Sequence, residues 1–507
     1  MSSTTPTMSS TPAPSKLLRV LVCGGGNAAH VLVGQLAARG HLATMLSTYP
    51  KEADCMRQGC DANDGVEVRG WGTKGAETIR GRPLSIVGTF AEAFSSLRSP
   101  RGVRYDVVLL AVPAPHHDAY LKGLAPYLAK SSAADAHDRI CAGAPEILPT
   151  ILAAAVAQGG FDMAARQALG DANVTGEVII AGLETLPWAC RIIKQGAVAE
   201  VLGTKDTVDA AVAVFGCDPS NLTNYAPAAL EVLQIAVGPT PKLNLASGFL
   251  GVTLSNVNAF WHPTLMWHRW RDWDGTPVSG PAPLLYEHAP DDLACDLMSD
   301  EVEEVVSKIR ERYPTCIDDL SSARGVNTWF LNAYGDEKSL NKTSTATMMR
   351  TNPAYKGLTH PMRPANDDDD TNDPKKKLVP DFQHRYIAED VGYGLVVIRG
   401  IAELVGVETL TIDKVILWAQ RAAKLSYLKE VHVADKPAAA FDPPRLTCSG
   451  ADLDKTRCPQ RFGYVDLSTF MRSNGYAFAE TKNTVEAAKD TPTTEGVVER
   501  RTSANAA

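Results

Sequence analysis

The sequence predicts an α/β N-terminal Rossmann-type doubly wound domain followed by an all-α C-terminal domain. Two observations support this prediction. An apolar strand near the N-terminus runs into a glycine-rich turn and a helix, and helical periodicity replaces the strand–helix alternation from about Pro239. The 507 residues are enough for two hydrophobic cores. We place the α/β domain at residues 16–239, the helical domain at 240–470, and disordered tails at 1–15 and 471–507.

The α/β domain begins with a strand–helix–strand unit. A continuous apolar run that ends in glycines is typical of a buried parallel strand, and a helical stretch and a second strand follow it. A later apolar run, VVLLAV, closed by a proline, predicts a central strand of the same sheet. The expected elements are strands at 17–23, 42–47, 107–112, 139–142 and 178–181 and a helix at 28–39.

The turn after the first strand has the pattern G-x-G-x-x-A and comprises Gly24, Gly25, Gly26, Asn27, Ala28 and Ala29. Gly24 would make the tight turn, Gly26 would let the backbone approach a pyrophosphate, and Ala29 would let the helix pack closely on the strand. The helix N-terminus would supply free N–H groups to the phosphates. The alternative is a glycine-rich turn without a ligand, but its position between strand and helix favours dinucleotide binding.

The residues leave the choice between NAD and NADP open. The acidic residue usual at the end of the second strand is missing, because this strand ends in MLSTY and Glu52 comes only later. Lys51 and Arg57 are near, but no arginine follows the strand directly. We also expect Val112 and Pro113, at the end of the central strand, to contact the cofactor.

The second domain is predicted from helical periodicity at 294–312, 326–334, 386–405 and 412–425. The charged run NDDDDTNDPKKK, residues 366–377, is typical of a solvated loop.

Composition excludes several classes of function. The net charge of −8 argues against a nucleic-acid surface, and the longest apolar runs are too short for a transmembrane helix. The ten cysteines lack paired C-x-x-C spacing, which argues against a zinc site, and they are typical of reduced thiols in a cytosolic protein. The N-terminal stretch lacks the apolar core of a signal peptide. We therefore expect a cytoplasmic protein without a metal, nucleic acid or membrane partner.

Seven segments together resemble one family, the octopine/opine dehydrogenases. The resemblance covers roughly residues 17–470, and the tails, the loop around 130–138 and the 366–377 run look like additions. The segments are CGGGNAAH (23–30), LETLPWACRI (183–192), EVLGTK (200–205), WHPTLMWHRWRDWDG (261–275), YKGLTHP (355–361), PDFQHRYIAED (380–390) and TRCPQRFGY (456–464). The resemblance implies an active site between the two domains, where an amino acid condenses with an α-keto acid and NADH reduces the imine.

Two histidines lie close together in NAFWHPTLMWHRW, and the resemblance assigns catalysis to His262, with Asp390 as its acidic partner. A buried structural histidine is the alternative for His262. Pro263 disfavours helical geometry in the residue before it, so we expect His262 at a helix entry. His268 lies about 240° further around an ideal helix, so we expect it to serve packing.

The resemblance also assigns four substrate contacts. Arg385 would bind the substrate carboxylate; it lies about 140° from the catalytic acid on one ideal helix, so we expect it at or before the helix start. Glu184 would contact the amino acid, with a solvated loop acid as the alternative. Trp329 would line the amino-acid pocket, although a core role is also open. Cys190 faces the substrate in the same pattern, and we expect packing there and no covalent catalysis.

The predicted function is opine dehydrogenation: NADH-dependent condensation of an amino acid, with L-arginine as one candidate, and an α-keto acid such as pyruvate. NADPH is not excluded. The alternatives are a related NAD(P)-dependent 2-hydroxy-acid or polyol-phosphate dehydrogenase of the same architecture, and a dinucleotide-binding protein without activity. The expected partners are small-molecule substrates, and the expected state is a monomer or weak homodimer.

Overall fold

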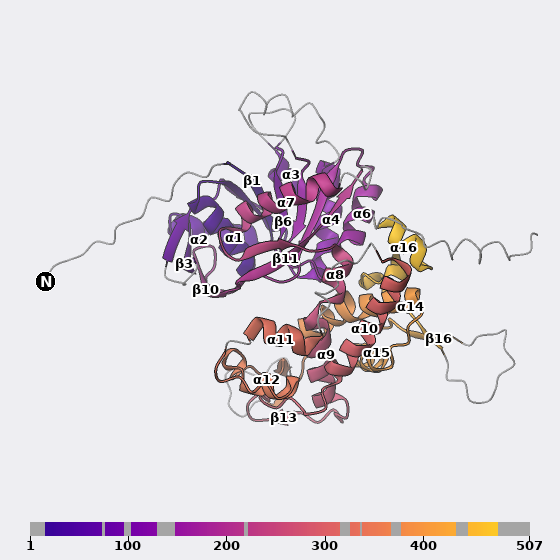
Figure 1. The fold of residues 1–507 in the computed structure, drawn as a ribbon. Coiled ribbons are helices and arrows are strands. Elements are labelled where there is room, and N and C mark those ends of the chain that lie inside the picture. Colours follow the sequence, from indigo (N-terminus) through magenta and orange to yellow (C-terminus); the bar gives the residue numbers. More distant parts are fainter. Residues whose placement is uncertain are drawn as a thin grey trace, which may run out of the picture.

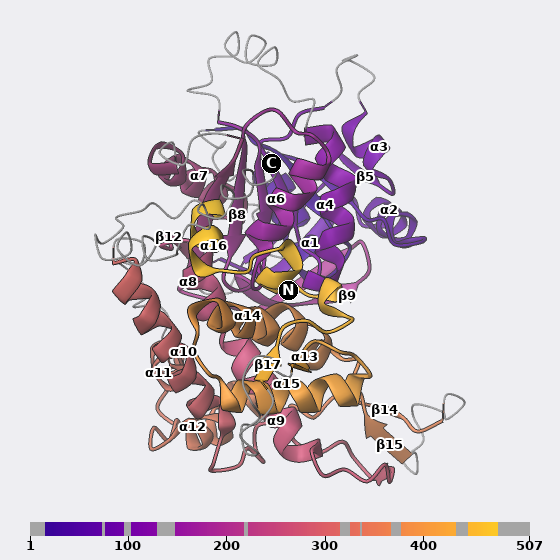
Figure 2. The same ribbon diagram turned by 90° about the vertical axis from the view of Figure 1, so that its right-hand side faces the viewer.

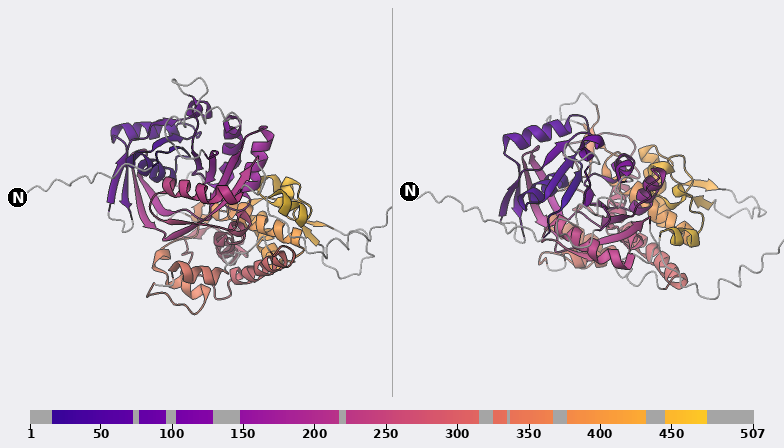
Figure 3. Two further views of the ribbon diagram at one scale, coloured as in Figure 1. Left: turned by 45° about the horizontal axis from the view of Figure 1, so that its top comes forward. Right: turned by 90° about the horizontal axis from the view of Figure 1, so that it is seen from above.

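The structure is a computed structural model in which two domains lie side by side (Figure 1). It describes residues 16–72, 77–95, 103–128, 148–216, 222–314, 325–334, 337–366, 377–431 and 445–474. In the left-hand view of Figure 3 the α/β domain lies above the mainly helical domain.

An eight-stranded sheet forms the centre of the first domain. The strand order is β12-β11-β8-β7-β6-β1-β2-β5, and every pair is parallel except β11 with β8. The six strands from β5 to β8 have the dinucleotide-binding order 3-2-1-4-5-6. The strands are β1 (Arg19–Cys23), β2 (Leu42–Leu46), β5 (Ser85–Val87), β6 (Val107–Leu110), β7 (Ile151–Ala154), β8 (Val178–Leu183), β11 (Thr207–Phe215) and β12 (Lys242–Leu245).

The strand order reverses between β1 and β6, which is where ligands bind in open α/β sheets. Both strands are buried along almost their whole length, as their unbroken apolar sequences require. Helices flank the sheet and extend its core on both faces. They are α1 (Asn27–Ala38), α2 (Glu52–Ala62), α3 (Phe90–Phe94), α4 (Ala114–Leu128), α6 (Phe161–Asp171) and α7 (Leu222–Val237).

A second sheet of the first domain was not predicted. It has the order β4-β3-β10-β9 and pairs strands far apart in the sequence. Its strands are partly exposed, which weakens their apolar pattern. They are β3 (Val66–Trp71), β4 (Glu77–Gly81), β9 (Trp188–Lys194) and β10 (Val198–Thr204).

The second domain is mainly helical, with two small sheets at its edge. Two expected helices, at 294–312 and 326–334, have the predicted bounds, whereas the expected helix at 386–405 is divided into α13, η4 and α14. The helices are α8 (Phe249–Leu254), α9 (Val257–Trp270), α10 (Ala294–Arg312), α11 (Val326–Tyr334), α12 (Thr345–Thr351), η3 (Pro353–Tyr355), α13 (Arg385–Ala388), η4 (Val391–Leu395), α14 (Val396–Val405) and α15 (Leu410–Ala423). The strands are β13 (Val278–Ser279), β14 (Met362–Pro364), β15 (Lys377–Pro380), β16 (Lys429–Val431) and β17 (Arg445–Thr447).

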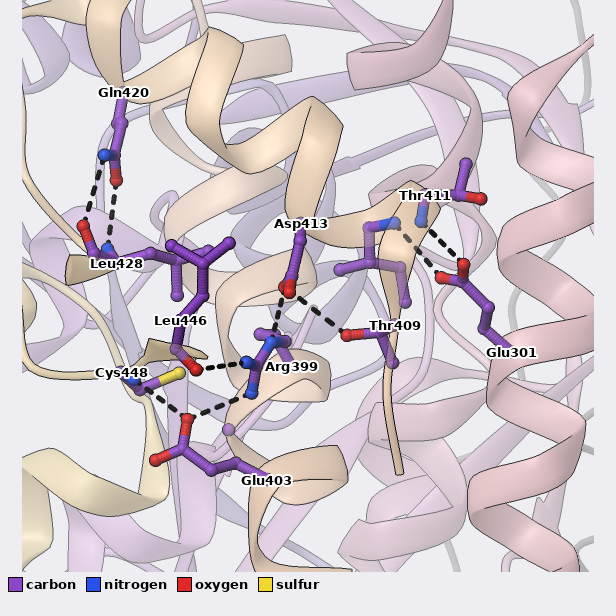
Figure 4. Close-up of polar contacts among 12 residues, drawn as sticks. Glu301, Arg399, Glu403, Thr409, Thr411, Asp413, Gln420, Leu428, Leu446 and Cys448 are labelled. Atoms are coloured by element: carbon purple, nitrogen blue, oxygen red, sulfur yellow. Dashed lines mark hydrogen bonds and ion pairs between the residues drawn. The ribbon is translucent and has the colours of Figure 1, made fainter. Parts of the chain in front are cut away.

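A buried arginine ties the helical domain together (Figure 4). Arg399 on α14 forms ion pairs with Glu403, one turn later, and with Asp413 on α15. Its Nη2 donates to the Leu446 oxygen, and Glu403 accepts from the Cys448 amide. All three guanidinium nitrogens therefore have protein partners, which offsets the cost of burying the charge.

The C-terminal segment returns to the first domain, where α16 (Leu467–Ser473) lies beside α6 and α8 (Figure 2). Before it come two short turns, η5 (Leu453–Lys455) and η6 (Pro459–Phe462). The buried Arg457 donates to the main-chain oxygens of Ala157 and Ala114, and Arg461 pairs with Asp118 on α4. These contacts join the two domains.

The observed elements cross the expected domain boundaries in two places. β12 extends the large sheet to Leu245, past the boundary expected at 239, because it pairs with β11. α16 continues to Ser473, past the tail expected to begin at 471. The predicted strand at 139–142, both tails beyond these limits, the loop around 130–138 and residues 367–376 of the charged run lie outside the described residues.

Candidate active site

His262 lies inside α9 (Val257–Trp270), not at a helix entry, so the expectation drawn from Pro263 is wrong. The helix continues through Pro263, although the proline removes one backbone hydrogen bond. Both residues are buried within the core of the helical domain. The surrounding packing outweighs the local preference of the residue before a proline.

Both ring nitrogens of His262 have partners. Nδ1 lies 2.8 Å from Oδ2 of Asp390, and Nε2 lies 2.9 Å from the Tyr286 hydroxyl. The Tyr386 ring stacks on the imidazole with centroids 3.9 Å apart. An ionised carboxylate only accepts, so Asp390 selects the tautomer with the proton on Nδ1 and leaves the Nε2 lone pair for a proton donor. Burial raises the pKa of Tyr286 well above its ordinary value, so its hydroxyl keeps its proton and donates to Nε2.

Asp390 occupies the junction between α13 and the π-helical turn η4, which begins at Val391. Such turns shift the register of the following side chains and are frequent at functional sites. The carboxyl group is fully buried, and its Oδ1 has no hydrogen-bond partner among the residues that the structure describes. A buried oxygen of this kind favours a ligand that supplies a donor.

Arg385 is the first residue of α13, with His384 as its N-cap, in agreement with the predicted helix start. Its side chain is half-exposed, and its Nε lies 3.3 Å from Oε2 of Glu389. Burial lowers the pKa of Arg385, but the charges of Glu389 and Asp390 outweigh this and raise it. A half-exposed guanidinium beside the His262–Asp390 pair suits a carboxylate ligand.

Glu389 connects the two domains at this point. Its side chain is buried, and Oε1 accepts a 3.0 Å hydrogen bond from the amide of Ala114, the first residue of α4. Ala114 directly follows Val112 and Pro113, the residues expected to contact the cofactor. The helical domain therefore contacts the carboxyl end of β6 beside the catalytic pair.

The glycine loop has the geometry that a dinucleotide needs. Gly24 has a φ of +122°, and a Cβ there would lie 2.8 Å from the Ala111 oxygen at the end of β6. Gly26 caps α1 without a side chain, and a Cβ there would meet nothing within 4 Å. Asn27 accepts from the Ile192 amide, which fixes the loop against β9. The first turn of α1 contains no acidic residue, so its N–H groups suit a pyrophosphate.

Glu52 lies near the end of β2, where the acidic residue usual in dinucleotide-binding domains is missing from the sequence. It begins α2, and its carboxylate accepts a hydrogen bond from the Ser47 hydroxyl just after β2. A Cβ on Gly25 would collide with the Glu52 side chain, so this carboxylate lies against the glycine loop. The spacing in sequence concealed it, because Glu52 reaches back from the following helix.

Comparison with known proteins supports the same interpretation. The family model for the alpha-helical domain of NAD/NADP octopine/nopaline dehydrogenases matches residues 245–423. Tauropine dehydrogenase of Arabella iricolor is 31% identical over 89% of this chain and 99% of its own length. Octopine dehydrogenase of Pecten maximus is 31% identical over 90% of this chain and 98% of its own length. A solved octopine dehydrogenase with NADH and L-arginine is 30% identical with a TM-score of 0.68, covering 90% of this chain and 98% of that one.

The chain belongs to the octopine/opine dehydrogenase family. Opine dehydrogenases are NAD(P)-dependent oxidoreductases that act on the CH–NH group of donors. The two-domain fold predicted from the sequence is confirmed.

The remaining predicted substrate contacts lie on both domains. Glu184 follows β8 at the carboxyl end of the sheet, and its Oε1 accepts from the Asp209 amide at 3.3 Å. Burial lowers the pKa of Lys205, and the nearby charge of Glu184 opposes this shift, while the ammonium donates to the Leu186 oxygen. Trp329 on α11 packs edge-on against Trp261, the neighbour of His262, with ring centroids 5.1 Å apart.

Cys190 of this opine dehydrogenase is buried in β9 within the core of the first domain. Burial raises the pKa of its thiol to about 11, which disfavours the thiolate that a nucleophile requires. This environment supports the expectation of packing and no covalent catalysis. His268 accepts from the Ala294 amide at 3.4 Å and stacks edge-on with Trp267, as expected for a packing residue.

Several residues of the site were not found from the sequence. Burial raises the pKa of Tyr386, and the charges of Arg385 and Arg191, one from each domain, oppose this shift. Tyr286 comes from the loop between α9 and α10, which lacks any periodic pattern. Arg191 lies in the segment LETLPWACRI, in which the resemblance assigned roles only to Glu184 and Cys190.

Within the described residues, no group of three His, Cys, Asp or Glu side chains is arranged to hold a metal ion. In the same part of the chain, no helix combines the length and apolarity needed to cross a membrane. Seven cysteines of the described residues are free thiols.

Proposed function

We propose that this protein is an NADH-dependent opine dehydrogenase that condenses an amino acid with an α-keto acid such as pyruvate. The proposal is supported above all by the buried His262–Asp390 pair, which lies where the helical domain contacts the carboxyl end of β6 through Glu389. NADH supplies the hydride that reduces the imine. The chain supplies groups that hold the substrates and move protons.

His262 carries out the proton transfer at Nε2. Asp390 holds the proton on Nδ1, so Nε2 accepts a proton from the amino group and returns one to the departing hydroxyl during imine formation. The Tyr286 hydroxyl, 2.9 Å from Nε2, helps to orient the ring. Stacking on Tyr386 fixes the plane of the ring.

Arg385 binds the carboxylate of the keto acid. Its half-exposed guanidinium presents several donors beside the catalytic pair, and a guanidinium fork matches a carboxylate. A solved octopine dehydrogenase with NADH and pyruvate is 29% identical with a TM-score of 0.65, which supports pyruvate as the first keto acid to test.

Glu52 selects NADH over NADPH. A carboxylate beside the glycine loop and the end of β2 can accept hydrogen bonds from a ribose diol, and it repels a 2′-phosphate. Glu52→Gln should lower the preference for NADH over NADPH, measured as the ratio of kcat/KM, by about 10-fold. An unchanged ratio would remove Glu52 from this role.

Glu184 is the proposed contact of the amino-acid substrate. The charge of Lys205 already acts on this carboxylate, which reduces its attraction for a second cation such as the arginine guanidinium. We therefore propose an amino acid as the second substrate without assigning its side chain, and L-arginine is one of the amino acids to be tested. Free thiols in the described residues support a cytoplasmic enzyme, and size-exclusion chromatography would test the proposed monomer or weak homodimer.

The test is NADH oxidation with pyruvate and a panel of small, neutral and basic amino acids, repeated with NADPH. We expect oxidation that depends on both substrates and a product in which the amine carries a carboxyethyl group, identified by mass spectrometry. Keto-acid reduction without any amine would instead indicate a hydroxy-acid dehydrogenase. Tight NADH binding without turnover on every pair would indicate a binding protein.

A further inference from the structure

We propose that Glu389 is a positioning residue that holds Arg385 for the keto-acid carboxylate and ties it to the cofactor side of the domain boundary. This inference rests on the proposed function, because it assigns a purpose to Arg385. Glu389 is adjacent to the catalytic acid Asp390 but points toward different partners.

The two oxygens of Glu389 have separate partners on the two domains. Oε1 accepts from the Ala114 amide at 3.0 Å, and Oε2 lies 3.3 Å from Nε of Arg385. One carboxylate therefore fixes the distance between the start of α4 and the substrate arginine. A movement of the helical domain against the first domain would alter this bridge and the hold of Glu389 on Arg385.

A purely structural purpose explains this arrangement poorly. The i,i+4 ion pair joins Glu389 to a half-exposed arginine, and such a pair contributes little to helix stability. The Glu389 carboxylate is buried, and a buried charge costs free energy unless its pairing is complete. Its partner Arg385 is half-exposed, which leaves the guanidinium accessible to a ligand while its Nε is held.

The chain offers a matched control in Glu403. It also forms an i,i+4 ion pair with an arginine, Arg399, in the same domain, but that arginine is buried and bonded through all three nitrogens. Glu403→Gln and Glu389→Gln thus make the same chemical change in two pairs of the same spacing. Only Glu389→Gln alters an arginine that a substrate can reach.

The experiment compares wild-type, Glu389→Gln and Glu403→Gln enzymes. In Glu389→Gln the amide oxygen can still accept from Ala114, but the neutral side chain can no longer form an ion pair with Arg385. We expect the KM for pyruvate to rise about 10-fold, with kcat and the KM for the amino acid within about twofold of wild type, because the lost ion pair orients only the keto-acid ligand. The midpoint of thermal unfolding should not fall, because the buried charge is removed.

Glu403→Gln should lower the unfolding temperature and leave the KM for pyruvate at the wild-type value. Equal pyruvate KM values for Glu389→Gln and wild type would overturn the positioning role. So would a joint fall of all kinetic constants and of the unfolding temperature, since that pattern marks a structural residue.

Pyruvate binding in the presence of NADH, measured by calorimetry, separates this proposal from the proposed function. If wild type binds pyruvate without amino-acid-dependent turnover, the proposed function fails, and a weaker pyruvate affinity in Glu389→Gln still supports the positioning role. If Glu389→Gln binds as tightly as wild type, the positioning role alone fails. If wild type binds no pyruvate, both fail.

Discussion

Two clusters of charged residues in the helical domain each contain an arginine, a glutamate four residues later and an aspartate. They differ in how many of their polar atoms have a partner within the protein. In one, Arg399 pairs with Glu403 and Asp413, its side chain is 7% exposed, and every guanidinium nitrogen has a protein partner (Figure 4). In the other, Arg385 pairs with Glu389, its side chain is 54% exposed, and the neighbouring Asp390 holds His262.

This difference distinguishes a cluster that stabilises the fold from a cluster that can bind a ligand. A buried charge whose bonds are all satisfied within the protein has nothing left for a ligand, so its contribution is to the fold. In the second cluster, Asp390 Oδ1 lacks a partner among the described residues, and the arginine keeps an accessible face. Incomplete bonding at a domain boundary therefore favours this cluster as the candidate active site.

The largest expected effect concerns the cluster of Arg399, Glu403 and Asp413, in which every guanidinium nitrogen has a protein partner. Arg399→Met removes the buried guanidinium and leaves the partly buried Glu403 and Asp413 carboxylates without their cation. The free energy of unfolding should fall by about 3–5 kcal/mol, measured by denaturant titration. The kcat of the folded fraction should stay at the wild-type value, and a loss of turnover without a loss of stability would contradict the division between the clusters.

The second prediction concerns the catalytic acid. In Asp390→Asn the amide can donate to Nδ1 of His262, which favours the wrong tautomer. We expect kcat to fall by at least about 100-fold, measured by steady-state NADH oxidation, while the fold remains. Asp413→Asn is the control, and it should reduce stability with little effect on kcat.

A smaller effect is expected at the other nitrogen of the imidazole. Tyr286→Phe removes the hydroxyl that lies 2.9 Å from Nε2 of His262 and should lower kcat by about 10-fold, because the ring loses one of its orienting bonds. Tyr355→Phe removes a hydroxyl from the ring stacked on Tyr286 and keeps the Nε2 contact. Equal rates in the two variants would show that Tyr286 only packs.

The smallest effect is a pH dependence at Glu389. Burial and the charge of Asp390 raise its pKa, while Arg385 opposes the shift; Tyr393 and Arg457 also face it. As the pH falls through this raised pKa, the carboxylate gains a proton and releases its hold on Arg385. The KM for pyruvate should therefore rise a few-fold toward acidic pH, and Glu389→Gln should lack this step in a pH profile.

Local patterns predicted the parts of the fold that depend on neighbours in sequence. The glycine loop, the first strand–helix–strand unit and the helices α10 and α11 follow directly from periodicity and turn residues. The second sheet was missed because β3 pairs with β10 and β10 with β9, and long-range pairing of half-exposed strands leaves little trace in the sequence.

Prediction of the site was limited in the same way, because contacts between distant segments leave little trace in the sequence. Resemblance brought His262 and Asp390 together, and the structure places them 2.8 Å apart. The argument from Pro263 failed because core packing of α9 outweighed a local backbone preference. Glu52 and Glu389 could not be assigned from spacing, because each carboxylate turns toward a distant segment, the glycine loop and α4 respectively.

The most direct test of the central claim is NADH oxidation by wild type and His262→Ala in the presence of pyruvate and the amino-acid panel. The account predicts oxidation that requires both an amino acid and a keto acid, and a kcat at least about 100-fold lower in His262→Ala with unchanged NADH affinity. An unchanged rate in His262→Ala, or oxidation that needs no amino acid, would contradict it.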